Sequence, residues 1–168
     1  MEMVLGYLRT EDMSSDLKLS RCSLDRIIRD QIHKYAGIFV SKKLTLTYES
    51  ISQDVLTDEK WLGFVIGQIL SNALKYTRTG SIRIWQKDPA ALVIEDTGIG
   101  IDPADIPRLG ERGFTGYNGR LDKKSTGIGL YLCKEISRRL SHTLTIESEP
   151  GKGTRVTIDF ATRQLQAE

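Results

Sequence analysis

The sequence predicts an α/β fold of the two-layer α+β sandwich type, in which a mixed sheet of about five strands carries helices on one face. Segments with apolar residues at helical spacing alternate with short segments that are rich in β-branched residues. Glycine is also unevenly distributed, because eight of the 15 glycines fall between Gly98 and Gly129. Such clustering indicates a loop whose backbone bends tightly or approaches a ligand closely.

The composition is typical of one globular domain with a proper core. The chain has 168 residues, of which 39% are apolar and 27% are charged. The net charge of +2 does not indicate nucleic acid or an anionic membrane as the main partner. No apolar run is long enough for a membrane span, and no signal peptide is expected. Cys22 and Cys133 lack metal or redox spacing, so we expect two reduced thiols.

The N-terminal part is predicted to be helical apart from one strand. Residues 1–13 are typical of the end of a helix. Ser23 is the predicted N-cap of a helix that runs to about Val40, and residues 44–49 alternate as in a strand. The apolar face of that helix is expected to consist of Leu24, Ile27, Ile28, Ile32, Tyr35 and Phe39.

The next helix, from the predicted N-cap Asp58 to about Thr77, combines two stripes. Its core-facing stripe is expected to consist of Leu62, Val65, Ile66, Ile69 and Ala73. A second stripe, about 100° around the helix, is polar and consists of Gln68, Asn72, Lys75 and Tyr76.

The polar stripe suits a complex of a metal ion with a triphosphate. The side-chain oxygen of Asn72 is a hard ligand for Mg²⁺, which also binds phosphate. Lys75 could neutralise a phosphate, and Tyr76 could lie against a base or ribose. An ordinary solvated helix face is the alternative, since most surface helices have one.

Two further strands, residues 81–87 and 91–96, end in the pattern DTGIG. Asp96, at the end of the second strand, could accept a hydrogen bond from an exocyclic amino group such as that of adenine. Gly98 and Gly100 would let the backbone pass close to such a ligand. The alternative is a strand that ends in a common Asp-Gly turn.

Residues 98–125 lack a lasting period and are predicted to form a loop with one short helical turn near residues 104–109. The segment ERGFTGYNGR within it combines glycines with cations, as expected of a lid over phosphates with Phe114 as its anchor. A solvated surface loop is the alternative.

A second glycine pair, in STGIGL, precedes a helix expected over residues 127–140. Unpaired N–H groups and the helix dipole at such an N-terminus favour an anion, although a helix start with a flexible approach would look the same. Strands at residues 143–148 and 153–160 close the domain, and the tail after Thr162 is expected to fray. Neither glycine pair forms a Walker A loop or a dinucleotide fingerprint, and the protein-kinase HRD and DFG motifs are absent from the sequence.

Taken in order, these motifs closely resemble the histidine-kinase ATPase domain of the GHKL superfamily, whose other branches include gyrase, Hsp90 and MutL. QILSNALKYT resembles its asparagine box, VIEDTGIGI its first glycine box, ERGFTGYNGR its phenylalanine box and STGIGLYLCKEI its second glycine box. GKGTRVTI resembles its closing strand, so the resemblance covers about residues 25–160. It implies a Bergerat-type ATP-binding fold. The residues of the motifs are most similar to those of kinases of Gram-positive bacteria that sense envelope stress and antimicrobial peptides.

The resemblance implies a role for each matching residue. Asn72 would hold Mg²⁺, Lys75 would touch a phosphate, and Tyr76 would pack beside the adenine. Asp96 would accept the adenine amino group. Gln68 departs from the family pattern, which often has asparagine or an acid there, so its metal role stays open.

The remaining nucleotide contacts that the resemblance implies lie in the glycine pairs, the lid and the closing strand. They are Gly98, Gly100, Ile101, Arg120 with Arg112 behind it, Thr126, Gly127, Gly129, Leu130 and Thr154. The implied catalytic set is Asn72, Gln68 and Lys75, and the implied cofactors are ATP and Mg²⁺.

Relatives transfer the γ-phosphoryl group of ATP to a histidine on a separate dimerisation domain. Neither His33 nor His142 matches the pattern of that acceptor, so both are expected to be structural or exposed. Residues 1–15 would be the end of a dimerisation helix, residues 16–162 the catalytic domain and residues 163–168 a disordered tail. The resemblance further implies a cytoplasmic domain, a homodimeric parent in the bacterial cell membrane and a response regulator as partner.

Two other functions fit the same motifs. One is a GHKL ATPase that drives a conformational clamp, against which the short lid counts. The other is a non-catalytic module that senses nucleotides, against which Asn72 and the lid cations count. ATP-dependent dimerisation with hydrolysis would favour the clamp, and failure to phosphorylate an acceptor domain would favour the module.

Overall fold

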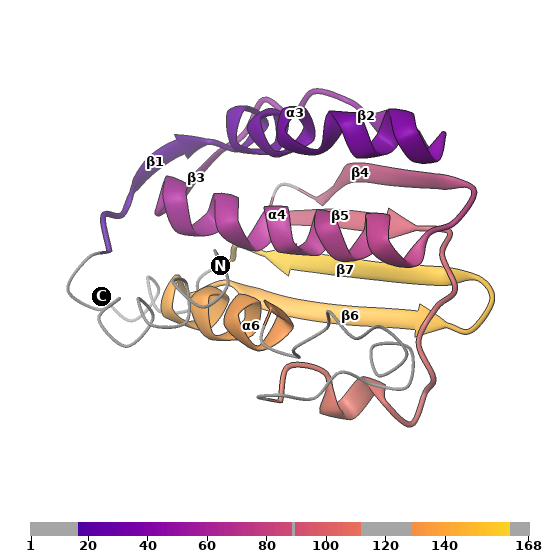
Figure 1. Ribbon diagram of the computed structural model, residues 1–168. Helices are drawn as coiled ribbons and strands as arrows, with labels where there is room; N and C mark the ends of the chain where they lie inside the picture. Colours follow the sequence, from indigo (N-terminus) through magenta and orange to yellow (C-terminus); the bar gives the residue numbers. More distant parts are fainter. Residues whose placement is uncertain (1–16, 89, 112–128, 162–168) are drawn as a thin grey trace.

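The computed structural model describes residues 17–88, 90–111 and 129–161, and they form a layer of helices on one face of a mixed sheet (Figure 1). The sheet has five strands in the order β2-β4-β5-β7-β6, in which β2 and β4 are parallel and the other neighbours antiparallel. The strands are β2 (Thr45–Tyr48), β4 (Ser81–Asp88), β5 (Ala91–Asp96), β6 (Thr143–Glu149) and β7 (Gly153–Asp159). The predicted two-layer α/β fold with a five-stranded mixed sheet is therefore confirmed.

Within the described part of the chain, three α-helices cover the sheet, and α4 lies between the other two. They are α3 (Leu24–Lys42), α4 (Glu59–Tyr76) and α6 (Gly129–Arg139). The fully buried strand residues Ile82 and Leu92 belong to the same core as Leu62, Ile66 and Leu132 of the helices. The apolar stripe predicted for α4 is buried as expected, because a helix in the middle of a layer has neighbours on both sides.

Both predicted N-caps are present, which explains where α3 and α4 begin. The Ser23 side chain accepts a hydrogen bond from the backbone N–H of Arg26 at 3.3 Å. The Asp58 carboxylate accepts one from Trp61 at 3.2 Å. These bonds satisfy N–H groups that have no partner within the first helical turn.

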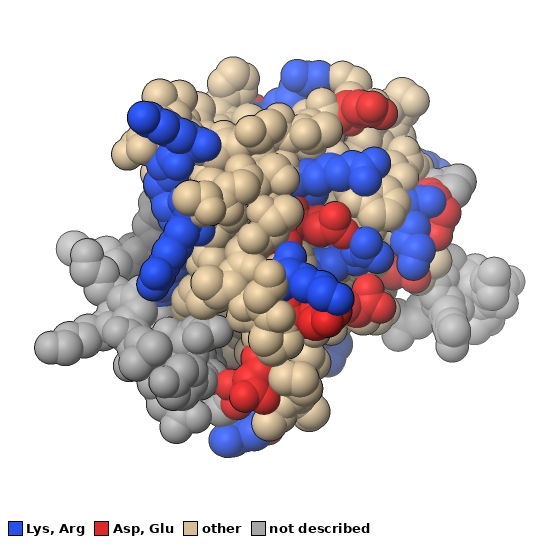
Figure 2. Space-filling view, turned by 90° about the vertical axis from the view of Figure 1, so that its right-hand side faces the viewer, with Lys and Arg blue, Asp and Glu red and all other residues tan. Residues whose placement is uncertain are grey.

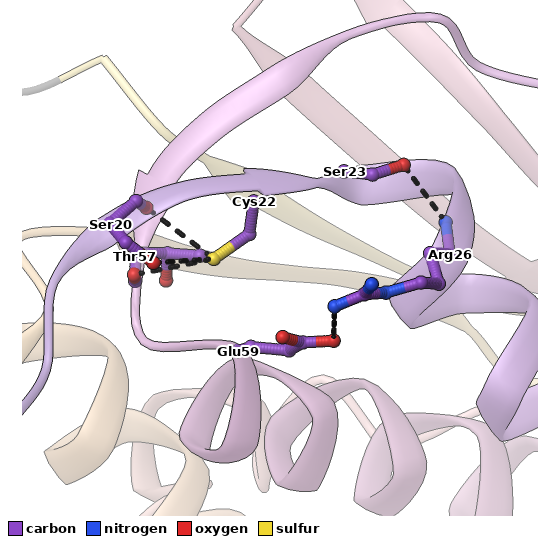
Figure 3. Close-up of polar contacts among 6 residues, drawn as sticks. All are labelled: Ser20, Cys22, Ser23, Arg26, Thr57 and Glu59. Carbon is purple, nitrogen blue, oxygen red and sulfur yellow. Dashed lines mark hydrogen bonds and ion pairs between the residues drawn. The ribbon is translucent and has the colours of Figure 1, made fainter.

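A second sheet of two antiparallel strands, β1 (Ser20–Ser23) and β3 (Asp54–Thr57), was not predicted. Figure 3 shows a contact between its two strands: the buried Cys22 thiol of β1 lies 3.3 Å from the Ser20 hydroxyl and 3.6 Å from the Thr57 carbonyl oxygen of β3. The ion pair between Arg26 and Glu59 links the first turns of α3 and α4. Strands of four mostly polar residues carry no periodic signal, so only their pairing reveals them.

Two smaller expectations, for the cysteines and for a short helical turn, agree with the structure. Both cysteines are free and buried, and burial raises the pKa of the Cys133 thiol to about 12. A short 3-10 turn, η1 (Ile106–Arg108), lies inside the helical turn predicted near residues 104–109. Among the described helices, none is both long and apolar enough to cross a membrane. The helix expected over residues 1–13 lies outside the described residues.

His142 is buried between α6 and β6, whereas His33 is exposed on α3. The Nε2 atom of His142 lies 2.9 Å from the Thr57 hydroxyl, and the ring stacks edge-on against Phe160 at 4.9 Å. Burial lowers the pKa of His142 to about 4, against smaller opposing effects of the Ser141 backbone and Asp159. The folded protein therefore keeps this imidazole neutral where an unfolded chain would protonate it.

This difference predicts that the domain loses stability as the pH falls from 7.5 to 5. The pKa of His142 lies below its unfolded value of about 6.5, so over this range the unfolded chain takes up a proton that the fold excludes. We expect the free energy of unfolding in urea to be about 2 kcal/mol lower at pH 5 than at pH 7.5. His142→Gln should remove most of this difference, and the control variant His33→Gln should retain it; equal slopes in the two variants would contradict the assignment.

Candidate functional site

The end of β5 and the end of α4 meet at one edge of the sheet, on the right in Figure 1. Asp96 is the last residue of β5, and Tyr76 is the last residue of α4. The backbone N–H of Ile99 donates to the Tyr76 carbonyl oxygen at 3.1 Å, so the first glycine pair lies against the C-terminus of α4. The structure thereby brings the predicted base-binding residues to the polar stripe of the helix.

This contact requires glycine at position 98, because it leaves no space for a side chain. A Cβ atom at this position would lie 2.5 Å from the Tyr76 carbonyl oxygen, 2.8 Å from the Asp96 carboxylate and 2.9 Å from the Thr77 hydroxyl. The N–H of Gly98 donates to the same Asp96 carboxylate at 2.8 Å. Gly98 therefore permits the close approach through its small size.

The Asp96 carboxylate is half-buried, and burial raises its pKa above the usual value. The backbone N–H groups of Gly98 and Thr154, and the hydroxyl of Thr77, oppose this shift because they stabilise the charged form. The Thr77 hydroxyl is fully buried and makes no well-formed hydrogen bond within the described residues. Asp96 is thus a partly desolvated acceptor that a donor group on a ligand could satisfy.

Thr77 is a member of the site that the sequence did not reveal. In the sequence Thr77 is only the approximate end of the predicted helix, and a threonine at a helix end has many structural uses. Only the fold of β5 against α4 shows that its hydroxyl adjoins Gly98 and Asp96.

The first glycine pair is also locked to the turn between β6 and β7. Gly100 has φ +75°, and a Cβ atom there would lie 2.2 Å from the Glu149 carbonyl oxygen. The N–H of Gly151 donates to the Ile99 carbonyl oxygen at 2.8 Å. Glycine is therefore favoured at position 100 for two reasons: the positive φ, and a backbone contact that excludes a side chain.

Three polar residues lie in a row across neighbouring strands next to this loop. Asp96 of β5 is paired with Thr154 of β7, which is paired with Ser148 of β6. The Ser148 hydroxyl accepts a hydrogen bond from the backbone N–H of Ile101 at 2.9 Å and lies 2.8 Å from the Thr154 hydroxyl. Thr154 was predicted as a contact of the adenine edge, whereas Ser148 was not singled out from the sequence.

The polar stripe of α4 is present at the helix surface, as its spacing predicted. The side chains of Gln68 and Asn72 are half-buried, and within the described residues neither has a hydrogen-bond partner. Lys75 is exposed, and its Nζ atom lies 5.2 Å from the centre of the Tyr76 ring. Two amide oxygens are hard donors that suit Mg²⁺, and the described residues include no cluster of three or more His, Cys, Asp or Glu side chains that could hold a metal. The donor set thus fits a hard cation such as Mg²⁺.

The second glycine pair is described in part. Gly129 and Leu130 form the first turn of α6, which packs beside α4 where the Cys133 thiol lies 3.9 Å from the Val65 carbonyl oxygen. Leu109, which directly follows η1, is held to α6 by a hydrogen bond of 2.6 Å from Lys134 Nζ to its carbonyl oxygen. Predicted contacts that lie outside the described residues are Arg112, Phe114, Arg120, Thr126 and Gly127.

The side of the molecule that contains this edge is shown in Figure 2, where Lys and Arg side chains are interspersed with Asp and Glu side chains. Opposite charges also alternate in a cross-strand row of the sheet, where Glu95 is paired with both Arg83 and Arg155. The Arg155 side chain forms an ion pair with Glu95 at 2.6 Å.

An α/β sandwich whose β5 carboxylate and glycine loop join the end of α4 defines a class of nucleotide-binding ATPase domains. A family model described as "Histidine kinase-, DNA gyrase B-, and HSP90-like ATPase" matches residues 57–164, which is more than half of the chain. The chain therefore belongs to this family, as its motifs predicted.

Two curated relatives that match the chain are sensor kinases. The chain is 36% identical to sensor histidine kinase YxdK of Bacillus subtilis, over 97% of the chain and 52% of that protein. It is also 36% identical to sensor protein kinase GraS of Staphylococcus aureus, over 93% of the chain and 46% of that protein. Both organisms are Gram-positive, and the chain spans about half the length of these relatives.

Solved structures confirm the fold. The structure of Acinetobacter baumannii histidine kinase AdeS matches with a TM-score of 0.74 and 20% sequence identity, over 96% of this chain and 76% of that chain. At such an identity the likeness supports the architecture, whereas the roles of the site residues rest on their own geometry.

The packing at Gly100 predicts a larger loss of stability than positive φ alone would cause. Gly100→Ala should lower the free energy of unfolding by roughly 3 kcal/mol, because the new Cβ atom would overlap the Glu149 carbonyl group. Gly151→Ala is a matched control, since its φ of +79° is similar and nothing lies within 4 Å of its Cβ position. We expect this control to cost about 1 kcal/mol in urea unfolding. Equal losses in the two variants would show that the contact with Glu149 is unimportant.

Proposed function

We propose that this chain is the ATP-binding catalytic domain of a two-component sensor histidine kinase, which transfers the γ-phosphoryl group of ATP to a histidine on a dimerisation domain. The observation that carries the proposal is the half-buried Asp96 carboxylate, which burial makes a costly anion unless a donor meets it. It stands at a strand end beside a glycine loop, where a flat purine can approach the backbone. The membership in the ATPase family supports ATP as the nucleotide.

In this proposal the adenine amino group donates to Asp96, and the loop of Gly98, Gly100 and Ile101 forms one wall of the base pocket. Tyr76 offers an aromatic surface at the end of α4, and Lys75 beside it supplies a positive charge for a phosphate. A base pocket shared by the loop and the helix fits the geometry, because the hydrogen bond from Ile99 to the Tyr76 backbone keeps the loop and the end of α4 together.

The phosphate chain is assigned to the two helices that lie side by side. Backbone N–H groups at the first turn of α6, including Gly129 and Leu130, offer donors to an anion, together with the helix dipole. Arg120, Thr126 and Gly127, from the segment before α6, are proposed to complete the set. Transfer then depends on positioning and on neutralising the phosphate charge, as is usual for phosphoryl transfer.

Magnesium is assigned to Asn72, whose side-chain oxygen lies on the polar stripe of α4 and has no partner among the described residues. Gln68, one turn earlier on the same stripe, is proposed as a second oxygen ligand on a longer stem. When bound, the ion would supply charge neutralisation and orientation of the triphosphate.

The relatives are about twice as long as this chain, which supports the proposal that the chain is one domain of a longer parent protein. Residues 16–162 are proposed as the catalytic domain, whereas the predictions made for residues 1–15 and 163–168 lie outside the described residues. The parent would be a homodimer anchored in the bacterial membrane, with this domain in the cytoplasm and a response regulator as the next phosphate acceptor. Since both relatives are named as sensor kinases, this function is favoured over an ATPase clamp or a sensing module.

The Asp96 assignment predicts a preference for adenine over guanine nucleotides. Calorimetric titration with Mg²⁺ should show tighter binding of ATP than of GTP, because guanine offers an oxygen where adenine offers an amino group. Asp96→Asn should weaken ATP binding by about 10- to 100-fold, the usual range for a charged hydrogen bond. The control Asp88→Asn changes an exposed carboxylate at the far end of β4 and should bind like the wild type. Unchanged affinity for ATP in Asp96→Asn would contradict the assignment of Asp96 to the adenine pocket.

The Asn72 assignment predicts that magnesium dependence is lost when its oxygen is removed. In the wild type, ATP should bind more tightly with Mg²⁺ than with EDTA, and in Asn72→Ala the two affinities should be equal. Transfer of labelled phosphate to a separately produced acceptor-bearing helical domain should fall on the order of a hundredfold. Gln68→Ala, measured alongside, tests whether the longer amide contributes. A variant Asn72→Ala that keeps the difference between Mg²⁺ and EDTA would refute the assignment, and a wild type that never phosphorylates the acceptor would refute the kinase function.

A further inference from the structure

We propose that Ser148 is a positioning residue for nucleotide specificity, which acts by turning the Thr154 hydroxyl into a pure acceptor at the edge of the base pocket. The inference rests on the proposed function, since it concerns the same pocket. It adds a residue that lies one strand away from the predicted contacts and that selects for purines with an amino group at position 6.

The Ser148 side chain lies where three parts of the site converge. Its hydroxyl oxygen is 2.9 Å from the backbone nitrogen of Ile101, in the loop that follows the first glycine pair. It is also 2.8 Å from the Gly153 carbonyl oxygen and 2.8 Å from the Thr154 hydroxyl oxygen, at the start of β7. Ser148 therefore joins the loop to the strand that is paired with Asp96.

Proton counting assigns the direction of these three hydrogen bonds. A serine hydroxyl has one proton to donate and two lone pairs to accept with. A carbonyl oxygen can only accept, so the single proton of Ser148 goes to Gly153. The N–H of Ile101 can only donate, and it occupies one lone pair of the Ser148 oxygen. The remaining bond, with Thr154, must then be donated by the Thr154 hydroxyl.

The consequence is that Thr154 has no proton left for a ligand. Its oxygen presents lone pairs only, and it stands beside Asp96, whose carboxylate also accepts when ionised. Paired residues on adjacent strands project from the same face of the sheet, so the two acceptors border one pocket. A 6-amino group has two protons to donate, whereas a 6-oxo group offers another acceptor and would face repulsion from both.

The loop itself does not depend on Ser148 alone. The hydrogen bond from Gly151 to the Ile99 carbonyl oxygen and the contact between Gly100 and Glu149 hold it to the same turn. Removal of the Ser148 hydroxyl should therefore leave the fold intact while it frees the Thr154 proton. The effect on specificity can then be separated from an effect on stability.

The test compares ATP with inosine triphosphate, which carries a 6-oxo group in place of the 6-amino group. Dissociation constants for both nucleotides are measured by calorimetry with Mg²⁺ for the wild type and for Ser148→Ala, Ser148→Thr and Thr145→Ala. In Ser148→Ala we expect ATP to bind about tenfold more weakly and the preference for ATP over inosine triphosphate to fall at least about fivefold. Ser148→Thr keeps a hydroxyl and should restore the preference, and Thr145→Ala removes an exposed hydroxyl of the same strand and should behave as the wild type.

A second variant shows whether Ser148 acts through Thr154. Thr154→Val keeps the shape of the side chain, removes its oxygen and should itself lower the preference for ATP. In that background, Ser148→Ala should cause no further change in the preference, because the group that it orients is gone. Thermal unfolding of each variant confirms that the folded state is being compared.

Three outcomes would overturn the inference. They are an unchanged preference in Ser148→Ala, a loss of ATP affinity in Ser148→Ala with the preference intact, and a further drop of preference when Ser148→Ala is added to Thr154→Val. Should Ser148→Ala not fold, an unchanged preference in Thr154→Val would overturn it equally. Failure of the proposed function looks different, because the wild type itself would then show no preference for ATP.

Discussion

The site depends on a close approach of three backbone segments, which is possible only where side chains are missing. The loop after β5 contacts the C-terminus of α4 at Gly98 and the β6–β7 turn at Gly100, and each contact leaves no space for a Cβ atom. Gly153, at the start of β7, is also in a place without space for a side chain, since a Cβ atom there would lie 1.9 Å from the Asp96 carbonyl oxygen. Three glycines thus hold the Asp96 carboxylate at a defined place between helix and sheet.

Burial of the Asp96 carboxylate costs folding free energy and favours the binding of a ligand that donates a hydrogen bond to it. Burial raises the pKa of Asp96, while donors from Gly98, Thr154 and Thr77 offset only part of the penalty. A partly desolvated carboxylate gains more from a new donor than an exposed one does, because less water is displaced when the ligand arrives. The same logic applies to the Asn72 amide, whose oxygen lacks a protein partner within the described residues and suits a hard cation.

Much of the fold was predictable because its signals are local. The N-caps Ser23 and Asp58, the apolar stripe of α4 and the two strands expected over residues 81–87 and 91–96 each depend on a few neighbouring residues, and the structure agrees with them. The β1–β3 sheet was missed because its strands are short and polar, and only a partner 30 or more residues away makes them strands. Thr77 and Ser148 were missed for a related reason: isolated hydroxyls follow no pattern, and their meaning comes from what lies across the fold.

The sequence alone determined the class of the protein, since the order of the asparagine, aspartate and glycine motifs requires no knowledge of distances. It also determined which residue types face the pocket, because a polar stripe on a helix and an aspartate at a strand end are properties of short segments. Tertiary structure decided how these segments meet: the register that places Ser148, Thr154 and Asp96 in one row, and the contacts that make glycine necessary at positions 98 and 100. Pairing between distant strands sets those positions, and sequence carries no local trace of such pairing.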